Sequence, residues 1–394
     1  MAAQSEHEQS EHEQRVTPLE LFFDLVFVFA ITQVTSLLSG DPTWTGVLHG
    51  MLVLTALWWA WAAYAWLTNT VDSDEGGVRI AMLGAMAAML VVSLAVPEAF
   101  GDHGVLFAVA YLVVRLLHLV LYAIAGKHDP ELLGAVLRLA ATATIAPIML
   151  VIAGFLEGDE RVTMWIVALA LDFLGPAVLG RGRGWRVSVE HFAERHSLIV
   201  LIALGESIVA IGVGVTDIAL DWGGVSAALL AIVVVSALWW LYFDVAAIIA
   251  RQLVMSLSGI EQIRAARDAY SYLHLPMVAG IVLFALGLKK TLDDVGEPLE
   301  TVPAFALAGG VALYLLAHCA FFLRLAHRLF RRRFIGGLVL IGLIPVVTEL
   351  PALASLALVA AVCVFVVAYE AIRHREHRAQ IRHPELADTE LVAP

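Results

Sequence analysis

The sequence predicts an all-α, polytopic membrane protein with about twelve transmembrane helices. Of the 394 residues, 60% are hydrophobic and 15% are charged, whereas soluble domains carry roughly 25% charged residues. The mean hydropathy is +0.85, and the apolar residues form long runs. A run of about 20 residues crosses a bilayer as one helix, so twelve spans need about 240 residues. The chain is long enough to supply them.

The predicted spans begin and end mostly at turn or polar residues. Gly40 to Pro42, Asp72 to Gly77 and Asp129-Pro130 are examples, and such residues interrupt helices. Only Glu349 to Pro351 separates the last two spans, so a tight turn is expected there. The predicted spans are 19–39, 44–67, 78–97, 104–125, 131–153, 162–180, 192–214, 223–249, 268–288, 302–325, 333–349 and 351–372.

The basic residues predict how the chain lies in the cell membrane. If both termini are cytoplasmic, 19 Lys and Arg residues fall on the inner side, and only Arg161, Lys289 and Lys290 fall in outer loops. Arg115 and Arg138 lie inside spans. This bias is the positive-inside pattern, and it favours cytoplasmic termini and an even number of spans.

Polar segments flank and interrupt the apolar runs. Residues 1–17 are expected to be a disordered acidic tail, because the repeated SEHEQ lacks apolar periodicity. Its His7 and His12 could bind a metal weakly, but a solvated tail is the better interpretation. Residues 373–394 form a polar C-terminal tail. The segment 251–267 is too polar to span and is expected to be an amphipathic helix on the inner surface, or else an ordinary loop helix.

Two halves of six spans, residues 18–181 and 182–372, resemble each other. Because six is even, both halves would insert in the same sense, as parallel repeats about an axis along the membrane normal. Chance similarity among Leu/Ala/Val-rich helices is the alternative. The matches are Leu25 to Gln33 with Leu198 to Glu206, Leu57 to Trp59 with Leu238 to Trp240, His118 with His318, and Ile145 to Pro147 with Leu343 to Pro345.

Ionisable and polar residues inside the spans are the candidate site. A charge inside a bilayer is costly, so it should face protein or water and be paired. Glu20 and Asp24 are four residues apart and share a helix face, while Gln33 points to the opposite side. That helix should therefore pack within protein or line a cavity. The candidates are Glu20, Asp24, Gln33, Arg115, His118, Arg138, Asp172, Glu206 and His318.

These candidates allow both functional and structural roles. Asp24 and Glu206 could bind a transported ion or proton, or could be structural ion-pair partners. Arg115 keeps its proton, so it is expected to pair with Asp24 or Glu206, or to bind an anionic group of a substrate.

The remaining candidates have the same ambiguity. His118 and His318 could titrate near neutral pH, although a hydrogen-bonded core histidine is the commoner case. Arg138, near the cytoplasmic face, could extend its side chain to the membrane surface. The paired tryptophans are expected in the inner interfacial belt: Trp58, Trp59, Trp239 and Trp240.

Several chemistries find no motif in the sequence. It contains no G-x-x-x-x-G-K-[ST], H-E-x-x-H, C-x-x-C or G-x-S-x-G. Lys127, Lys289 and Lys290 lie at span ends, so a buried Schiff base has no candidate lysine. No catalytic, cofactor-binding or metal-binding residue is predicted, and an enzyme is not favoured. No soluble segment is long enough to bind nucleic acid as a domain.

Two stretches resemble a known family. Pro18 to Gln33 (PLELFFDLVFVFAITQ) and Glu194 to Val209 (ERHSLIVLIALGESIV) are similar to the most recognisable stretches of the bacterial low-temperature-requirement A (LtrA) proteins. The resemblance covers roughly residues 15–375. It implies a multi-pass bacterial membrane protein named for a growth phenotype in the cold, without a settled activity. It marks Glu20, Asp24 and Glu206 as motif positions.

The leading hypothesis is a secondary transporter or ion-conducting protein, with buried carboxylates where the two halves meet. One alternative is a non-catalytic membrane protein that supports cold adaptation. Another is an integral-membrane enzyme acting on a hydrophobic small molecule through Asp24, His118 and Arg115. The expected partners are the lipid bilayer and an ion or small-molecule substrate. The sequence assigns neither the substrate nor the oligomeric state.

Overall fold

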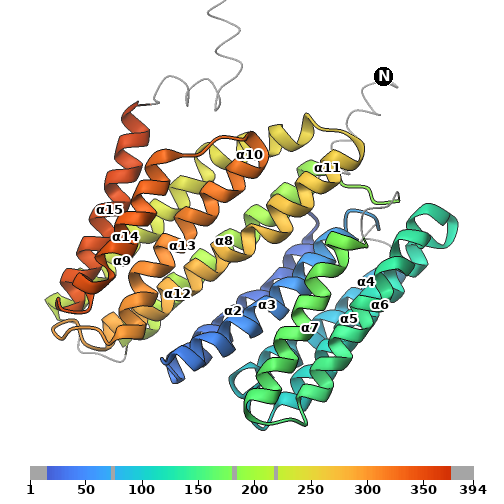
Figure 1. The fold of residues 1–394 in the computed structure, drawn as a ribbon, viewed down its shortest axis with the longest axis horizontal. Helices are drawn as coiled ribbons and strands as arrows, with labels where there is room; N and C mark the ends of the chain where they lie inside the picture. The colour runs from blue at the N-terminus through green and yellow to red at the C-terminus, as the bar shows by residue number, and fades with distance from the viewer. Residues whose placement is uncertain (1–15, 72–75, 180–183, 217–220, 374–394) are drawn as a thin grey trace, which may run out of the picture. The chain divides into compact units, whose positions relative to one another are not determined.

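The computed structural model describes residues 16–71, 76–179, 184–216 and 221–373 (Figure 1). The all-α prediction is confirmed, since an α-helix occupies each of the twelve predicted spans. Among the described residues, eleven helical segments are long and apolar enough to cross a membrane. Both predicted tails, with His7 and His12, lie outside the described residues almost entirely.

The chain divides into two compact units. The first is drawn from Met1–Ile199 and Ser258–Arg267. It contains α2 (Pro18–Gly40), α3 (Trp44–Leu67), α4 (Gly76–Ala95), α5 (Gly104–Ala125), α6 (Pro130–Ala153), α7 (Gly158–Val178), the first part of α8 (Val189–Thr216) and α11 (Gly259–Ala266).

Side-chain caps fix where several of these helices begin. Thr17 caps α2 through a capping box, in which its side chain accepts from the Glu20 amide while Glu20 bonds back to the Thr17 backbone. Thr43 caps α3 by accepting from the Gly46 amide at 3.1 Å, and Asp129 caps α6 in the same way. These local signals explain why the predicted boundaries lie close to the observed ones.

Helix α3 is the central element of the first unit, with contacts to α2, α5 and α7. Trp58 and Trp59 are 3% and 6% exposed, so placing them in an interfacial belt was wrong. They pack inside the unit because α3 is covered on several sides. Trp239 and Trp240 of the second unit are instead 41% and 37% exposed.

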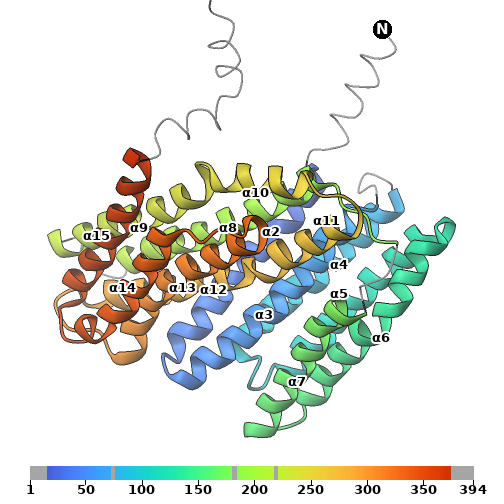
Figure 2. The same cartoon turned by 45° about the horizontal axis from the view of Figure 1, so that its top comes forward.

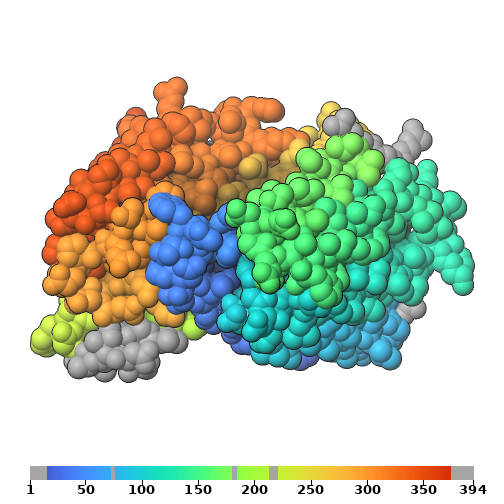
Figure 3. Space-filling model, turned by 60° about the horizontal axis from the view of Figure 1, so that its bottom comes forward, coloured from blue at the N-terminus to red at the C-terminus, as the bar shows by residue number. Residues whose placement is uncertain are grey.

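The outer helices of the first unit present an apolar surface. Figure 3 shows the green atoms of α7 beside the blue-green atoms of α6 on one face. Leu137 and Ile145 of α6 are 64% and 49% exposed, and Leu174 of α7 is 59% exposed. Large apolar side chains exposed in this way contact lipid in a membrane-embedded protein.

The second unit is drawn from Val200–Leu257 and Asp268–Pro394. Within it α12, α13, α14 and α15 are successive neighbours, and α9 lies beside α15 (Figure 2). Its helices are the rest of α8, α9 (Trp222–Phe243), α10 (Ala246–Met255), α12 (His274–Asp293), α13 (Thr301–Ala326), α14 (Arg331–Val347) and α15 (Ala352–Arg373).

Helices α12 and α13 cross at very short range. A Cβ atom added to Gly280 would lie 2.6 Å from the Gly310 carbonyl oxygen, and one added to Gly310 would lie 2.6 Å from that of Gly280. Small residues allow such backbone contact between membrane helices. The two glycines therefore set the separation of α12 and α13.

The segment 251–267 is largely helical as predicted, but it is divided between two helices and does not form one. Helix α9 ends at Phe243, α10 and α11 follow as separate helices, and a π-helical segment, Arg267–Tyr272, precedes α12. The break has a backbone cause, because Gly259 has φ +57°, a left-handed conformation that favours glycine.

The tight turn predicted between the last two spans is present. Helix α14 ends at Val347 and α15 begins at Ala352. The Ser355 hydroxyl donates to the Val347 carbonyl at 3.1 Å and so ties the two helices together. With 17 residues, α14 is the shortest helix among the predicted spans.

The two units share an order of neighbours. Helices α4 to α7 are successive neighbours in the first unit, as α12 to α15 are in the second, and α3 contacts α7 as α9 contacts α15. A duplication would produce this order. The repeat and its boundaries, 18–181 and 182–372, stay predictions.

Candidate functional site

Two acidic residues lie at the beginning of α2. Glu20 is in its first turn and Asp24 is one turn further along, on the same face. Glu20 Oε2 accepts from the Thr17 amide at 2.9 Å and from the Thr17 hydroxyl at 3.1 Å. The capping of the helix therefore helps to hold the Glu20 side chain in place.

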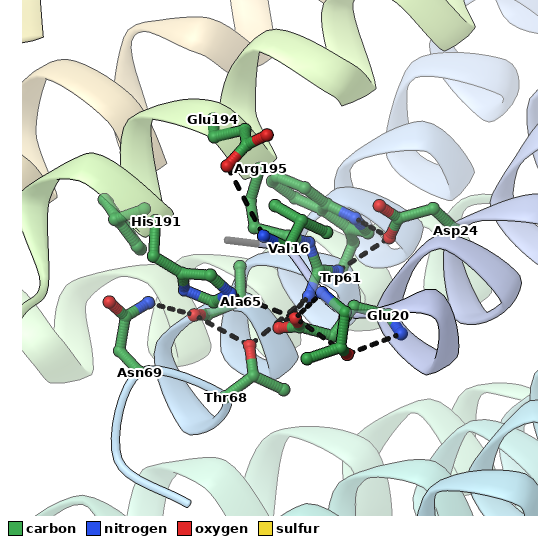
Figure 4. Close-up of polar contacts among 12 residues, drawn as sticks. Val16, Glu20, Asp24, Trp61, Ala65, Thr68, Asn69, His191, Glu194 and Arg195 are labelled. Atoms are coloured by element: carbon green, nitrogen blue, oxygen red, sulfur yellow. Dashed lines mark hydrogen bonds and ion pairs between the residues drawn. The ribbon is translucent and has the colours of Figure 1, made fainter. Parts of the chain in front are cut away.

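Helix α8 supplies the basic side chains that face these acids. His191 and Arg195 are also four residues apart, so they too share one face. His191 Nε2 lies 3.0 Å from Glu20 Oε2. Arg195 donates from Nη1 to Glu20 Oε1 at 2.8 Å and from Nη2 to Asp24 Oδ1 at 2.7 Å (Figure 4). We call Glu20, Asp24, His191 and Arg195 the Arg195 cluster.

Helix α3 supplies neutral partners to this cluster. The Trp61 indole donates to Asp24 Oδ1 at 2.9 Å, and Thr68 accepts from Arg195 Nη1 at 3.3 Å. The Arg195 guanidinium also lies 5.8 Å from the centre of the Trp61 ring, within the range of a cation–π contact. Three helices thus hold one charged group of residues.

The Arg195 cluster is almost completely excluded from solvent. The side chains of Arg195, Glu20 and Asp24 are 0%, 1% and 2% exposed, and that of His191 is 8% exposed. His191 is therefore the member nearest to solvent. Buried charges at such depth are held only when they are paired and hydrogen-bonded.

The two acids of the cluster differ in how completely they are bonded. Glu20 accepts from Thr17, His191 and Arg195 through both oxygens. Asp24 uses Oδ1 alone, and its buried Oδ2 has no hydrogen-bond partner within the described part of the chain. An unpaired oxygen of a buried carboxylate is costly. A proton or a small cation would remove that cost at Asp24.

Arg115 pairs with Asp172, so the predicted pairing with Asp24 or Glu206 was wrong. Arg115 Nη2 on α5 lies 2.9 Å from Asp172 Oδ1 on α7, and both side chains are 3% exposed. Trp59 is also hydrogen-bonded to Asp172. Asp24 is already bonded to Arg195 and Trp61, and α7 presents its own carboxylate to Arg115.

Both predicted histidines lie in the core. His118 Nε2 lies 3.1 Å from the Ala63 carbonyl oxygen; that oxygen can only accept, so Nε2 carries the proton. His318 is fully buried and its Nδ1 contacts Arg333. Arg333 in turn forms a two-pronged ion pair with Glu370. These contacts match the role of hydrogen-bonded core histidines.

The other candidates differ in how deeply they are buried. Gln33 is half-buried and Arg138 is exposed, as a side chain reaching for the membrane surface would be. Glu206 is 3% exposed and belongs to the second unit. Within the described ranges, no group of three or more His, Cys, Asp or Glu side chains is arranged to hold a metal ion.

Sequence reasoning missed His191 and Arg195 as site residues. The positive-inside pattern includes Arg195 among the 19 basic residues of the inner side, although it lies within the predicted span 192–214. One signal could have found it. The spacing of His191 and Arg195 equals that of Glu20 and Asp24, so two helices inserted in the same sense can pair their charges in register.

Comparisons with known proteins found a matching family and a similar bacterial protein. Residues 15–368 match the family described as Bacterial low temperature requirement A protein (LtrA). Uncharacterized protein RA0937 of Rhizobium meliloti (strain 1021) is 33% identical over 306 residues, which cover 75% of this chain and 74% of that protein. No solved structure matches the chain.

Proposed function

The chain belongs to the bacterial low temperature requirement A family, and we propose that it is a proton-coupled secondary transporter in which Asp24 binds the proton. It lies in the cell membrane with both termini in the cytoplasm, as the distribution of basic residues favours. The Arg195 cluster then lies near the cytoplasmic end of α2, since Glu20 is in the first turn of that helix.

The imbalance of charge in the Arg195 cluster carries this proposal. Two carboxylates, Glu20 and Asp24, face one guanidinium, and all three side chains are at most 2% exposed. Together these three groups carry one net negative charge, which is costly for groups buried so completely. One added proton balances it. The unpaired Asp24 Oδ2 is the oxygen at which that proton is best accommodated.

His191 offers a route for the proton. Its side chain is the most exposed of the cluster, at 8%, and its ring bonds Glu20 directly. A proton taken up by His191 can thus reach the cluster from one side of the membrane, as alternating access requires.

Protonation of Asp24 would also change how two helices are held. The Asp24–Arg195 bond joins α2 to α8 at 2.7 Å, and a charge-assisted bond weakens when the carboxylate becomes neutral. These are the first helices of the two predicted halves. Proton binding therefore weakens a contact that holds α2 against α8. A transporter needs such a coupling between proton binding and helix movement.

A charge-movement experiment tests the proposal without knowledge of the substrate. Proteoliposomes are adsorbed on a solid-supported membrane, and the outside pH is stepped from 8 to 6. The wild type is expected to give a transient current, because a proton enters a buried site. Asp24→Asn is expected to abolish the transient current, because the amide cannot take up a proton there.

Glu370→Gln is the matched control, since it also removes a carboxylate bonded to an arginine. Glu370 balances Arg333 one to one, so this variant is expected to keep the transient current. Folding is checked by size-exclusion chromatography for every variant. A correctly folded wild type without a transient current, or an Asp24→Asn variant that retains it, would contradict the proposal.

A further inference from the structure

A second buried group in the first unit has more hydrogen-bond donors than its protein partners use. Arg115 donates from Nη2 to Asp172, but its Nε and Nη1 have no hydrogen-bond partner in the ranges that the structure describes. The same holds for the Tyr111 hydroxyl. Arg115 and Tyr111 are 3% and 1% exposed.

These donors belong to one place. Tyr111 precedes Arg115 by four residues on α5, which puts both side chains on one helix face. Tyr111 is also close enough to interact electrostatically with both Arg115 and Asp172. Two acceptors of this region are already engaged, because Asp172 bonds Arg115 and Trp59, and the Val114 carbonyl accepts from Tyr64 at 3.0 Å.

Buried donors are nearly always paired in proteins, and an unpaired donor on a charged group is the most costly kind. The guanidinium can only donate and the phenol hydroxyl can also donate, so a partner that both groups share is an acceptor. From this geometry we propose that Arg115 and Tyr111 form a binding site for a small monovalent anion. The proposal does not rest on the proton-coupled function of the Arg195 cluster.

The position of the site limits what the anion can be. Arg115 is near the middle of α5, which runs from Gly104 to Ala125, so it lies about 16 Å from either end at 1.5 Å per residue. A lipid headgroup stays near the membrane surface and does not reach that depth. Burial by aromatic and aliphatic neighbours also favours a small ion, either a halide or a compact carboxylate.

Asp172 competes with this anion for the Arg115 guanidinium. It holds one side of the guanidinium at 2.9 Å and repels any second negative charge placed nearby. Removal of its charge should therefore strengthen anion binding. A purely structural Arg115–Asp172 pair predicts something different, namely a less stable protein with no change in its response to anions.

The test is a thermal unfolding titration of the full-length protein in detergent. Sodium chloride or sodium formate replaces sodium gluconate at constant ionic strength, and the dissociation constant comes from the rise in unfolding temperature with anion concentration. The wild type is expected to show a saturable rise with chloride or formate. Chloride alone identifies a halide site, and formate alone identifies a carboxylate site.

Three variants locate the site. Tyr111→Phe removes one donor and keeps the ring, so binding should weaken about fivefold, which corresponds to one hydrogen bond. Asp172→Asn should tighten binding by about tenfold or more, because a like charge a few ångströms away is removed. Tyr314→Phe is the matched control, since its hydroxyl already donates to the Leu238 carbonyl, and it should bind as the wild type does.

Two results would overturn the proposal. In the first, neither anion shifts the unfolding temperature of the wild type relative to gluconate, so that the donors bind water alone. In the second, Tyr111→Phe or Asp172→Asn has the wild-type affinity, so that the anion binds elsewhere. The charge-movement experiment on Asp24 is unaffected by either result.

Discussion

Arg195 and Arg333 are buried arginines in different units, and their surroundings differ in charge. Arg333 donates from Nε and Nη2 to the two oxygens of Glu370 at 2.9 and 2.7 Å, and from Nη1 to the Leu241 carbonyl at 2.9 Å. All of its nitrogens have partners, and one carboxylate balances it. The side chains of this pair are 7% and 19% exposed.

Arg195 faces two carboxylates and is less exposed. Its Nε has no hydrogen-bond partner among the residues described, and neither has Asp24 Oδ2. Burial alone therefore does not distinguish a structural ion pair from a chemical site. The difference lies in charge balance and in completeness of hydrogen bonding. The Arg333 pair is balanced and all nitrogens of its guanidinium are bonded, whereas the Arg195 cluster can still accept a proton.

The largest expected effect is a difference in stability between substitutions of these two arginines. Arg195→Met leaves two buried carboxylates without their cation and should lower the free energy of unfolding by about 3–5 kcal/mol. Arg333→Met should cost less, because Glu370 is partly exposed and can be hydrated. Denaturant unfolding in detergent measures both. Equal losses would mean that burial, not charge balance, dominates.

The next comparison concerns matching helix pairs. Gly280→Ala places a methyl group 2.6 Å from the Gly310 carbonyl oxygen of α13 and should destabilise the protein by about 1–3 kcal/mol through overpacking. In the first unit, a Cβ on Gly84 of α4 would lie 4.0 Å from Leu117 Cδ1 of α5. Gly84→Ala should therefore be neutral or slightly stabilising, as measured by thermal unfolding.

The third comparison is within the Arg195 cluster. Glu20→Gln loses charge-assisted bonds to His191 and Arg195 and weakens the helix cap, so it should cost about 2 kcal/mol of unfolding free energy. Asp24→Asn keeps an acceptor for Trp61 and should cost about 1 kcal/mol. In the charge-movement experiment the order should be reversed. Asp24→Asn, the less destabilising of the two substitutions, should lose the transient current. If both assays rank the two variants in the same order, Glu20 and Asp24 do not have separate structural and proton-binding roles.

The smallest effect is a matched pair of hydroxyl deletions. The Tyr64 hydroxyl donates to the Val114 carbonyl at 3.0 Å in the first unit, and the Tyr314 hydroxyl donates to the Leu238 carbonyl at 2.9 Å in the second. Tyr64→Phe and Tyr314→Phe should each lower the unfolding free energy by about 1 kcal/mol. Clearly unequal losses would indicate that the units are not equally well packed.

Local signals made the helices predictable from the sequence. Long apolar runs set their number, and caps such as Thr43 and Asp129 set where they begin. The family was also recognisable, because the stretch from Pro18 to Gln33 is distinctive. The break at Gly259 was missed because a glycine does not reveal its backbone conformation until neighbouring residues impose it.

The pairing of charges could not be predicted in the same way. Glu20, Asp24, Arg115 and Asp172 were found as buried residues, since the cost of charge in a membrane identifies them. Their partners depend on which helix lies beside which, and that is a property of tertiary packing. Arg195 and Arg333 resembled ordinary residues of a basic membrane face, although both point inward.

The start of α2 has an evolutionary consequence. Glu20 Oε2 accepts from the Thr17 backbone and from the His191 ring, so one side chain both closes a helix cap and anchors a buried ion pair. The two tasks share a single mutational target. A substitution at Glu20 removes the helix cap and the contact with His191 together. A second substitution at Thr17 or at His191 can restore only one of these two contacts. A substitution at Glu20 therefore alters the start of α2 and its contact with α8 at the same time.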